Sequence, residues 1–472
     1  MSLIKNCGLA VAIASFSQPL LAQANTIELY VDTKTQQLFA EPGEGRVKLG
    51  NFRRADDNPV VPTPQLATAA PVAQPPAASP NRNTNVNIRG YVQARHSSIL
   101  AGDKGVDLWT DRSVGDRNSI ANDSFLIRRG RLVFSGDRGD HVHFYIQPDF
   151  ASAAGTTGNV LQLRDAYVDL HLNKDKVHRF RVGQSKVPYG FENLQSSQNR
   201  LTLDRADAMN SAVRDERDTG IFYYYTPTHI QQRFAEIAQA GLKHSGNYGM
   251  FGLGLYNGQG ANRRDVNDTL HTVARATWPM KTNSGQFYEV GVQGYTGKFV
   301  PGTASFTGSD GMRNQVVANS AANDERFRRG FTDERIGISA IMYPQPFGLQ
   351  AEWNWGTTPG LDNNTRRIEE TSLNGGYLQA MYKHDTGKES AIIPFAKWQY
   401  FDGANKAENN APRNRVNDWE LGVEWQLNRQ IELTAVYHMM NRNNLLTGNR
   451  ADLADFARFD SDALRLQLQV SY

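Results

Sequence analysis

The chain has 472 residues, enough for one large barrel or for two to three soluble domains. Its 51 Lys plus Arg residues nearly balance 48 Asp plus Glu residues, and the net charge of +3 argues against a nucleic-acid-binding protein, which would carry a clearly basic surface. The mean hydropathy is −0.55, and no run approaches the ~20 apolar residues of a transmembrane helix, which argues against a helical membrane protein.

Residues 1–24 have the three parts of a signal peptide. Lys5 supplies the positive charge, residues 8–16 form a short apolar run, and residues 22–24 read Ala-Gln-Ala, a small-residue cleavage site. The sequence therefore predicts export. Cys7 is the only cysteine and lies in this leader, so we expect the exported chain to contain neither a disulfide nor a cysteine metal site.

Two short regions follow the leader. Residues 25–55 predict a small β-hairpin unit, because residues 27–31 alternate apolar and polar and turn-forming residues follow at 41–45. Residues 56–83 are rich in Pro and Ala, a composition that cannot bury a core and that tends to be extended. We interpret this second region as a linker.

The remainder of the chain, 84–472, predicts an all-β domain made of strands of about 9–11 residues, the length that crosses a bilayer when tilted. Seventeen segments alternate in polarity, and single-chain bacterial barrels have an even number of strands. The weakest patterns fall within 217–243, which we expect to form one strand plus a loop, leaving sixteen. The candidate segments are 85–95, 123–135, 141–150, 161–172, 178–184, 217–225, 233–243, 248–257, 269–278, 287–295, 335–343, 347–356, 375–383, 392–401, 418–427, 430–440 and 461–472.

The last segment shows the alternation most clearly. Residues 464, 466, 468, 470 and 472 are apolar or aromatic, and residues 465, 467, 469 and 471 are polar. Side chains alternate across a strand, so one face is apolar and the other polar. A soluble β-sandwich can contain such a strand, but a transmembrane barrel requires it, with apolar side chains toward lipid and polar side chains toward water. The final aromatic, Tyr472, also resembles the signal that bacterial outer-membrane barrels present to their assembly machinery.

The connectors support the same fold because short and long ones alternate, as periplasmic turns and extracellular loops do. The 185–216 connector is too long for a hairpin turn and could fold into the lumen as a constriction. On the 123–135 strand, Arg129 and Arg131 should point into the lumen if Leu132 and Phe134 face lipid. The planar fork of arginine suits bidentate binding of an oxyanion. The alternative for any single arginine is an ordinary solvated charge on the lumen wall.

Four segments in this order resemble one family, the phosphate-selective porins O and P. They are FLIRRGRLVF at 125–134, LRDAY at 163–167, FRVGQ at 180–184 and YGFE at 189–192. The similarity extends from about residue 85 to residue 472 and is strongest over 123–220. The resemblance implies a sixteen-stranded homotrimeric outer-membrane barrel that passes phosphate or other anions.

The resemblance also implies an anion site. The family's paired arginine, strand aspartate and loop serines fall on Arg128 and Arg129, on Asp165, and on Ser196 and Ser197. The family's next loop residue is a lysine, but here that position is Gln198, with Arg200 nearby but at a different phase. Asp165 could orient the guanidinium groups of Arg128 and Arg129, or it could simply form a salt bridge in the lumen.

One weaker pattern concerns metals. His141 and His143 are two residues apart on one predicted strand, a spacing from which two histidines can ligate zinc, and His171 could lie close by. The alternative is that all three are polar residues of the lumen. We expect no cofactor and no catalysis.

The sequence thus favours an outer-membrane porin for passive, anion-biased diffusion, with Arg128, Arg129, Arg131 and the Ser196–Arg200 stretch setting selectivity. Its expected partners are outer-membrane lipid and lipopolysaccharide, small anions such as phosphate, and two further copies in a homotrimer, with the N-terminal unit in the periplasm. Three alternatives stay open. They are a general porin that tolerates cations, a plugged barrel whose loops bind at the cell surface, and a barrel-embedded hydrolase.

Overall fold

The structure is a computed structural model that describes residues 27–32, 38–39, 41–52, 84–103, 124–154, 157–303, 306–307, 313–314, 329–362, 367–444 and 457–472. The predicted signal peptide and the predicted linker lie outside the described residues. The chain divides into two compact units, Met1–Ala78 and Ser79–Tyr472. In the first unit, β1 (Ile27–Asp32) pairs antiparallel with β2 (Leu38–Phe39) and with β3 (Arg46–Phe52). The predicted hairpin unit is therefore a small three-stranded sheet.

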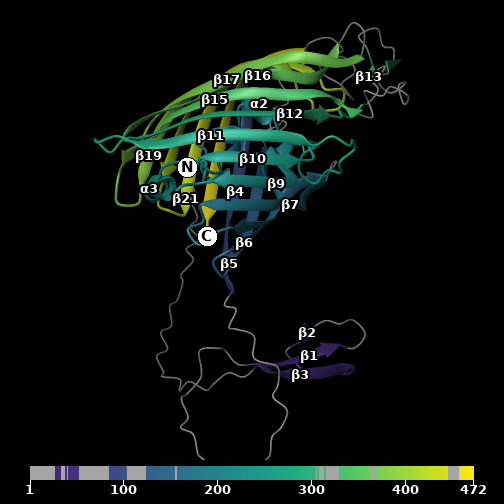
Figure 1. Cartoon of the computed structure of the whole chain (residues 1–472), viewed down its shortest axis with the longest axis vertical. Coiled ribbons are helices and arrows are strands. Elements are labelled where there is room, and N and C mark those ends of the chain that lie inside the picture. The colour runs from purple at the N-terminus through teal and green to yellow at the C-terminus, as the bar shows by residue number, and fades with distance from the viewer. Residues whose placement is uncertain are drawn as a thin grey trace, which may run out of the picture. The chain divides into compact units, whose positions relative to one another are not determined.

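The second unit is a closed antiparallel barrel (Figure 1). Each strand pairs with its neighbour in the chain, and β22 closes the barrel onto β4. Sixteen long strands form the wall, which confirms the predicted fold and strand number. They are β4 (Thr84–Gly102), β5 (Ser124–Arg138), β6 (Val142–Ala154), β7 (Thr157–His171), β8 (His178–Lys186), β9 (Arg217–Tyr225), β10 (Phe251–Tyr256), β11 (His271–Lys281), β12 (Phe287–Phe299), β15 (Phe331–Met342), β16 (Phe347–Asp362), β17 (Arg367–Tyr382), β19 (Ala391–Ala404), β20 (Arg413–Gln426), β21 (Ile431–Asn444) and β22 (Ala457–Ser471).

Shorter elements accompany the wall. The two-residue strand β18 (His384–Asp385) pairs with β19, and β13 (Phe306–Thr307) pairs with β14 (Arg313–Asn314) as a separate ribbon. None of the helices in the described part of the chain is long and apolar enough to cross a membrane.

The two faces of the wall differ as the alternation predicts. On β22, Leu466, Leu468 and Val470 are exposed on the outside of the barrel, whereas Arg465 and Gln467 are buried inside it. On β22 the polar face therefore points into the barrel, and the apolar face points outward.

The candidate strand at 233–243 does not form. The chain forms a helix there, α3 (Thr228–Gln239), in the connection between β9 and β10. Its buried residues Ile230, Phe234 and Ile237 are spaced four and three apart, which places them on one face of a helix. The expectation that 217–243 holds a single strand is confirmed, because β9 is that strand.

The connectors define two ends of the barrel. We call the end with the turns 139–141, 343–346 and 427–430 the short-turn end, and the opposite end the long-loop end. The α3 connection belongs to the short-turn end, because Tyr225, the last residue of β9, pairs with His178, which follows another short connector. The 187–216 connection, which we call the inward loop, begins at the opposite end of β8 and folds into the barrel.

Candidate functional site

The inward loop carries three short helical turns, α1 (Phe191–Leu194), α2 (Asp207–Asn210) and the 3-10 turn η2 (Arg214–Glu216). Four apolar clusters join the loop to the wall between β9 and β21. Phe191, for example, packs with Phe287 and Tyr343 near the short-turn end. Because apolar contact excludes water, these clusters occupy that side of the lumen, which we call the filled half.

Buried polar groups fix the start of the loop. The chain turns inward at Gly190, whose φ of +78° favours glycine. The Glu352 carboxylate on β16 then accepts hydrogen bonds of 2.6 Å from the backbone N–H groups of Phe191 and Glu192. The Glu192 side chain continues across the lumen to the Lys397 ammonium on β19, at 2.5 Å. Charge-assisted bonds of this kind hold the loop in one position.

A second segment enters the lumen from the short-turn end. After α3, residues 240–248 cross the barrel, and we call them the strap. The Lys243 ammonium reaches the carboxylates of Glu424 at 2.7 Å and Glu432 at 3.1 Å, on β20 and β21. Although burial opposes the charge, these two carboxylates raise the pKa of Lys243 to about 12. The strap is therefore tied to the wall by ion pairs to two carboxylates, and Lys243 is cationic throughout the physiological pH range.

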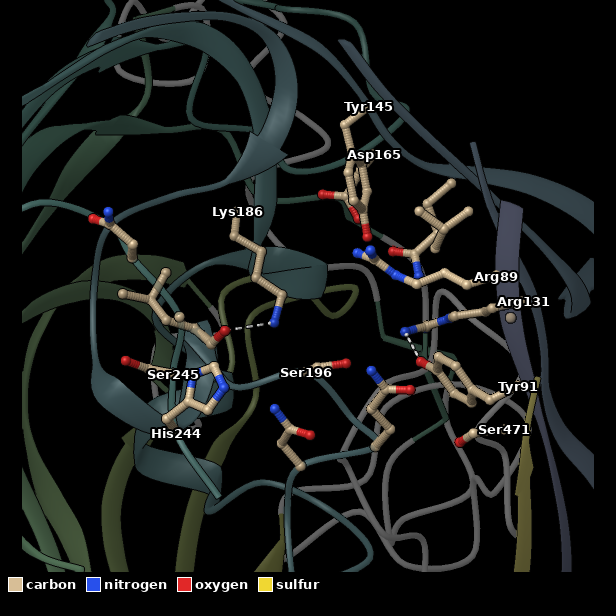
Figure 2. A pocket seen from close by; sticks show the side chains of 18 of the residues that line it. Arg89, Tyr91, Arg131, Tyr145, Asp165, Lys186, Ser196, His244, Ser245 and Ser471 are labelled. Carbon is tan, nitrogen blue, oxygen red and sulfur yellow. Dashed lines mark hydrogen bonds between the residues drawn. The ribbon is translucent and has the colours of Figure 1, made fainter. Parts of the chain in front are cut away.

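The open half of the lumen, lined mainly by β4–β8 and β22, holds a cavity of about 690 Å³. Figure 2 shows Lys186, His244 and Ser245 on one side of it and Tyr91, Arg131 and Ser471 on the other. Six cationic side chains line the cavity, against two carboxylate side chains. The cations are Arg89, Arg131, Arg181, Lys186, Arg217 and Arg429, and the carboxylates are Asp165 and Glu432.

A β-bulge places two consecutive arginines in the lumen. Gln93 pairs with Arg129, and Ala94 pairs with Ile127, so Arg128 is the extra residue of β5. Regular alternation would point Arg128 and Arg129 to opposite faces, but an extra residue shifts the phase by one. Both are buried inside the barrel. Alternation along the strand predicted this orientation for Arg129 and Arg131, whereas Arg128 was expected at the site only from the family resemblance.

Arg128 and Arg129 belong to a cluster on the long-loop side of Arg131. Its centre is the loop carboxylate of Asp204, which pairs with Arg95 at 3.1 Å and with Arg465, and which lies 3.9 Å from Arg128. Arg129 lies within electrostatic reach of Arg128 and Arg200. Burial, followed by the charge of Arg205, lowers the pKa of Arg200 to about 10, so Arg200 is still cationic at neutral pH. Among the described residues, the Nε atoms of Arg129 and Arg200 have no acceptor.

Arg131, rather than the pair Arg128 and Arg129 that the resemblance implies, bonds to Ser197. The Arg131 Nη1 group donates to the Ser197 hydroxyl at 3.0 Å and to the Tyr91 hydroxyl at 2.9 Å. Its Nε group donates to the Asp149 carboxylate at 2.6 Å. Arg131 is therefore held rigidly, and its charge is largely balanced by Asp149.

Asp165 lies elsewhere than we expected. Its carboxylate accepts a bond of 2.9 Å from the Nε of Arg217, at the start of β9. Arg217 thus takes the place beside Asp165 that we predicted for Arg128 and Arg129. The expectation was wrong because β9 closes against β8, a pairing that brings residues 52 apart in the chain into contact. The alternative interpretation of Asp165, a salt bridge in the lumen, is the one the geometry supports.

Two lysines approach the loop stretch where the family lysine is replaced by Gln198. The Lys186 ammonium donates to the backbone carbonyls of Leu194 at 3.0 Å and Gln195 at 2.5 Å. The Lys243 ammonium lies 3.5 Å from the carbonyl of Gln198, but its carboxylate partners balance its charge. Lys186 points into the cavity (Figure 2), beside Ser196. An ammonium has three donors, so two carbonyls leave one donor for another acceptor.

The entry of the loop into β9 forms a compact ionic network. Glu216 accepts bonds from Arg205, Arg217 and Arg164. Burial alone would favour the neutral carboxyl, but these guanidinium groups hold the pKa of Glu216 well below its usual range. The network keeps the end of the inward loop against the wall.

The histidine pattern does not form a metal centre. A ring nitrogen of His141 contacts the His171 carbonyl at 2.7 Å, and a ring nitrogen of His143 contacts the Asp137 carboxylate at 3.2 Å. Among the described residues, no group of three His, Cys, Asp or Glu side chains is placed to hold a metal.

Sequence reasoning missed several lumen residues. Arg89 and Arg95 lie on the polar face of β4, a signal that alternation could have supplied. The partners of Arg217 and Arg465 could not be predicted from alternation, because each arginine pairs with an aspartate distant in the chain.

The sequence model of the family described as phosphate-selective porin O and P matches residues 107–472. No curated protein sequence matches the chain. Among solved structures, the outer membrane channel DcaP of Acinetobacter baumannii is 15% identical, with 82% of this chain and 97% of that chain covered and a TM-score of 0.46. An anion-selective porin from Comamonas acidovorans is 12% identical, with 83% and 100% covered and a TM-score of 0.45. On the family match, the chain belongs to the phosphate-selective porin O and P family of outer-membrane porins.

Proposed function

We propose that the open half of the lumen is a pathway for passive, anion-biased diffusion of small solutes, including oxyanions such as phosphate. The observation that carries this proposal is the excess of cationic side chains over carboxylates in the cavity lining, six against two, with Arg89 and Lys186 lacking a carboxylate partner among the described residues. Charges at the narrow part of a pore raise the local concentration of the oppositely charged ion.

The carboxylates of the filled half do not offset this cationic lining. Asp418 pairs with Arg442 and Glu424 pairs with Lys243, so their charges are balanced on the side that the inward loop covers. Glu432 lines the open cavity, but it is also paired with Lys243.

For phosphate, we propose that Lys186 supplies the ammonium that the family places at the position of Gln198. Lys186 lies beside Ser196 in the same cavity, and its two carbonyl partners carry no formal negative charge. The arginines around Asp204, on the long-loop side, would attract anions toward Lys186 and Ser196. In the proposed homotrimer, part of the exposed apolar surface of the barrel would face neighbouring subunits.

The test is the reversal potential of single channels in a planar bilayer under a potassium chloride gradient, followed by titration with phosphate. We expect a potential set mainly by chloride, with Lys186→Gln moving it toward zero and weakening block by phosphate. Lys174→Gln is the matched control, since this lysine is exposed on a short turn outside the cavity. A potential set by potassium would contradict the proposal, and a barrel that conducts no ions would favour the plugged alternative.

A further inference from the structure

The cavity of the open half combines its cationic charge with aromatic rings. Five tyrosines line it, at 91, 145, 167, 248 and 472. A small inorganic anion is strongly hydrated and gains little from an aromatic wall. Rings next to cations fit a ligand that has both a negative charge and a flat apolar surface of its own.

Two of these tyrosines form the centre of an ordered column. The rings of Tyr145 on β6 and Tyr167 on β7 stack with their centroids 5.1 Å apart and their planes 7° apart. The Arg181 guanidinium lies 3.7 Å from the centroid of Tyr167. On the other side, the Arg89 guanidinium lies 5.8 Å from the centroid of Tyr145. The column therefore runs from Arg89 through two rings to Arg181.

The two ends of this column differ in how their charges are balanced. Arg181 is buried and binds the Asp169 carboxylate through two bonds of 2.7 and 2.9 Å. Arg89 is exposed to the cavity and, within the described part of the chain, makes no hydrogen bond or ion pair. Its separation from Tyr145 lies near the outer limit of a cation–π contact. The Arg89 end of the column thus offers a guanidinium that makes no hydrogen bond or ion pair in the described part of the chain, next to an aromatic face. The Asp165 carboxylate lies at the same end (Figure 2), where its charge is balanced by Arg217.

We propose that this end of the column is a binding site for aromatic carboxylates. The ring of the ligand lies against Tyr145, and its carboxylate accepts hydrogen bonds from the Arg89 guanidinium. This inference rests on the proposed anion-biased pathway and adds a class of substrate to it, organic anions with a conjugated ring. A neutral sugar could also use the rings but would leave the Arg89 guanidinium without a carboxylate partner.

The experiment compares block of the single-channel current by benzoate and by cyclohexanecarboxylate. The two anions carry the same charge and are similar in size, but only benzoate has a π face. We expect benzoate to block at a concentration lower by about tenfold, the effect of one favourable aromatic contact. Benzamide, which has the ring without the charge, should block far more weakly than benzoate.

Variants test the contribution of the Tyr145 ring separately from that of the Arg89 charge. Tyr145→Leu should abolish the preference for benzoate, whereas Tyr145→Phe should keep it, because the phenylalanine ring retains the aromatic face. Arg89→Gln should weaken block by both carboxylates to a similar extent. Tyr382→Leu is the control, since Tyr382 is exposed on β17 and does not line the cavity.

The outcomes distinguish this inference from the function on which it rests. Anion selectivity with equal block by benzoate and cyclohexanecarboxylate would overturn the aromatic site and leave the anion pathway intact. Loss of the preference in Tyr382→Leu as well would also overturn it. Potassium selectivity, with no block by either carboxylate, would overturn both.

Discussion

The filled and open halves of the lumen are built from the same kind of strand but hold different side chains. In the filled half, inward positions such as Tyr377 and Phe401 are apolar and pack against Met209 of the inward loop. In the open half, inward positions such as Arg131 and Arg181 are cationic and surround water-accessible space. The inner wall of a porin therefore need not be polar throughout. A loop with its own apolar face can cover the apolar part of the wall.

The strap lies where the two halves meet. The cavity of about 690 Å³ and a second cavity of about 460 Å³ share Asn199, His244, Arg429 and Glu432 in their linings. Lys243 lines only the second of them. The strap therefore divides the short-turn end of the lumen into two spaces. We expect the ion pairs of Lys243 to keep these spaces separate.

The largest expected effect is in the filled half. Phe191→Ala removes a fully buried ring between the loop and the wall, and we expect the free energy of unfolding to fall by about 3–5 kcal/mol. The inward loop should loosen, so single-channel conductance should rise and become noisy. Phe125→Ala is the matched control, because Phe125 is 84% exposed on β5. Equal losses of stability in the two variants would contradict the division into halves.

The next effect is at the strap. Lys243→Met leaves Glu424 and Glu432 close together without their cation, and we expect a loss of about 3 kcal/mol in the free energy of unfolding. Conductance should increase because the two spaces can merge. Adding Glu424→Gln should restore part of the stability, since it removes the uncompensated charge. If the second substitution brings no recovery, the ion pair does not hold the strap.

A smaller effect is expected in the open half. Ser197→Ala removes the hydroxyl that joins Tyr91 to Arg131, and we expect a loss of about 1 kcal/mol in the free energy of unfolding. Arg131 keeps its bond to Asp149, so the salt-gradient reversal potential should change little. A loss in the free energy of unfolding as large as that of Phe191→Ala would show that the open half does not tolerate substitution better than the filled half.

The smallest effect is that of alkaline pH on the strap. The pKa of Lys243 is raised to about 12, above the value near 10.4 expected in the unfolded chain. The stability that the raised pKa of Lys243 contributes is therefore fully present below about pH 10 and is lost only as pH rises through about 12. Conductance and thermal stability should not change through titration of Lys243 between about pH 8 and about pH 10. A transition in that interval that disappears in Lys243→Met would contradict the assignment.

The barrel could be predicted from the sequence alone. Alternation along a strand is a local property, so the apolar outer face and the polar inner face could be predicted from neighbouring residues. The pattern gave seventeen candidate strands, and the general rule that single-chain barrels have an even number reduced them to sixteen. The long connector at 185–216 followed from its length. The inward orientation of Arg129 and Arg131 was predictable from the alternation, and both are buried inside the barrel.

The arrangement of side chains in the lumen could not be predicted in this way, because it depends on the tertiary structure. A bulge shifts the phase by one residue and turns Arg128 inward together with Arg129, which no local pattern reveals. The pairing of Asp165 with Arg217 and the reach of Lys243 to Glu432 join residues 52 and 189 positions apart. Such contacts depend on closure of the barrel and on the path of the loop, which are set by packing over the whole domain.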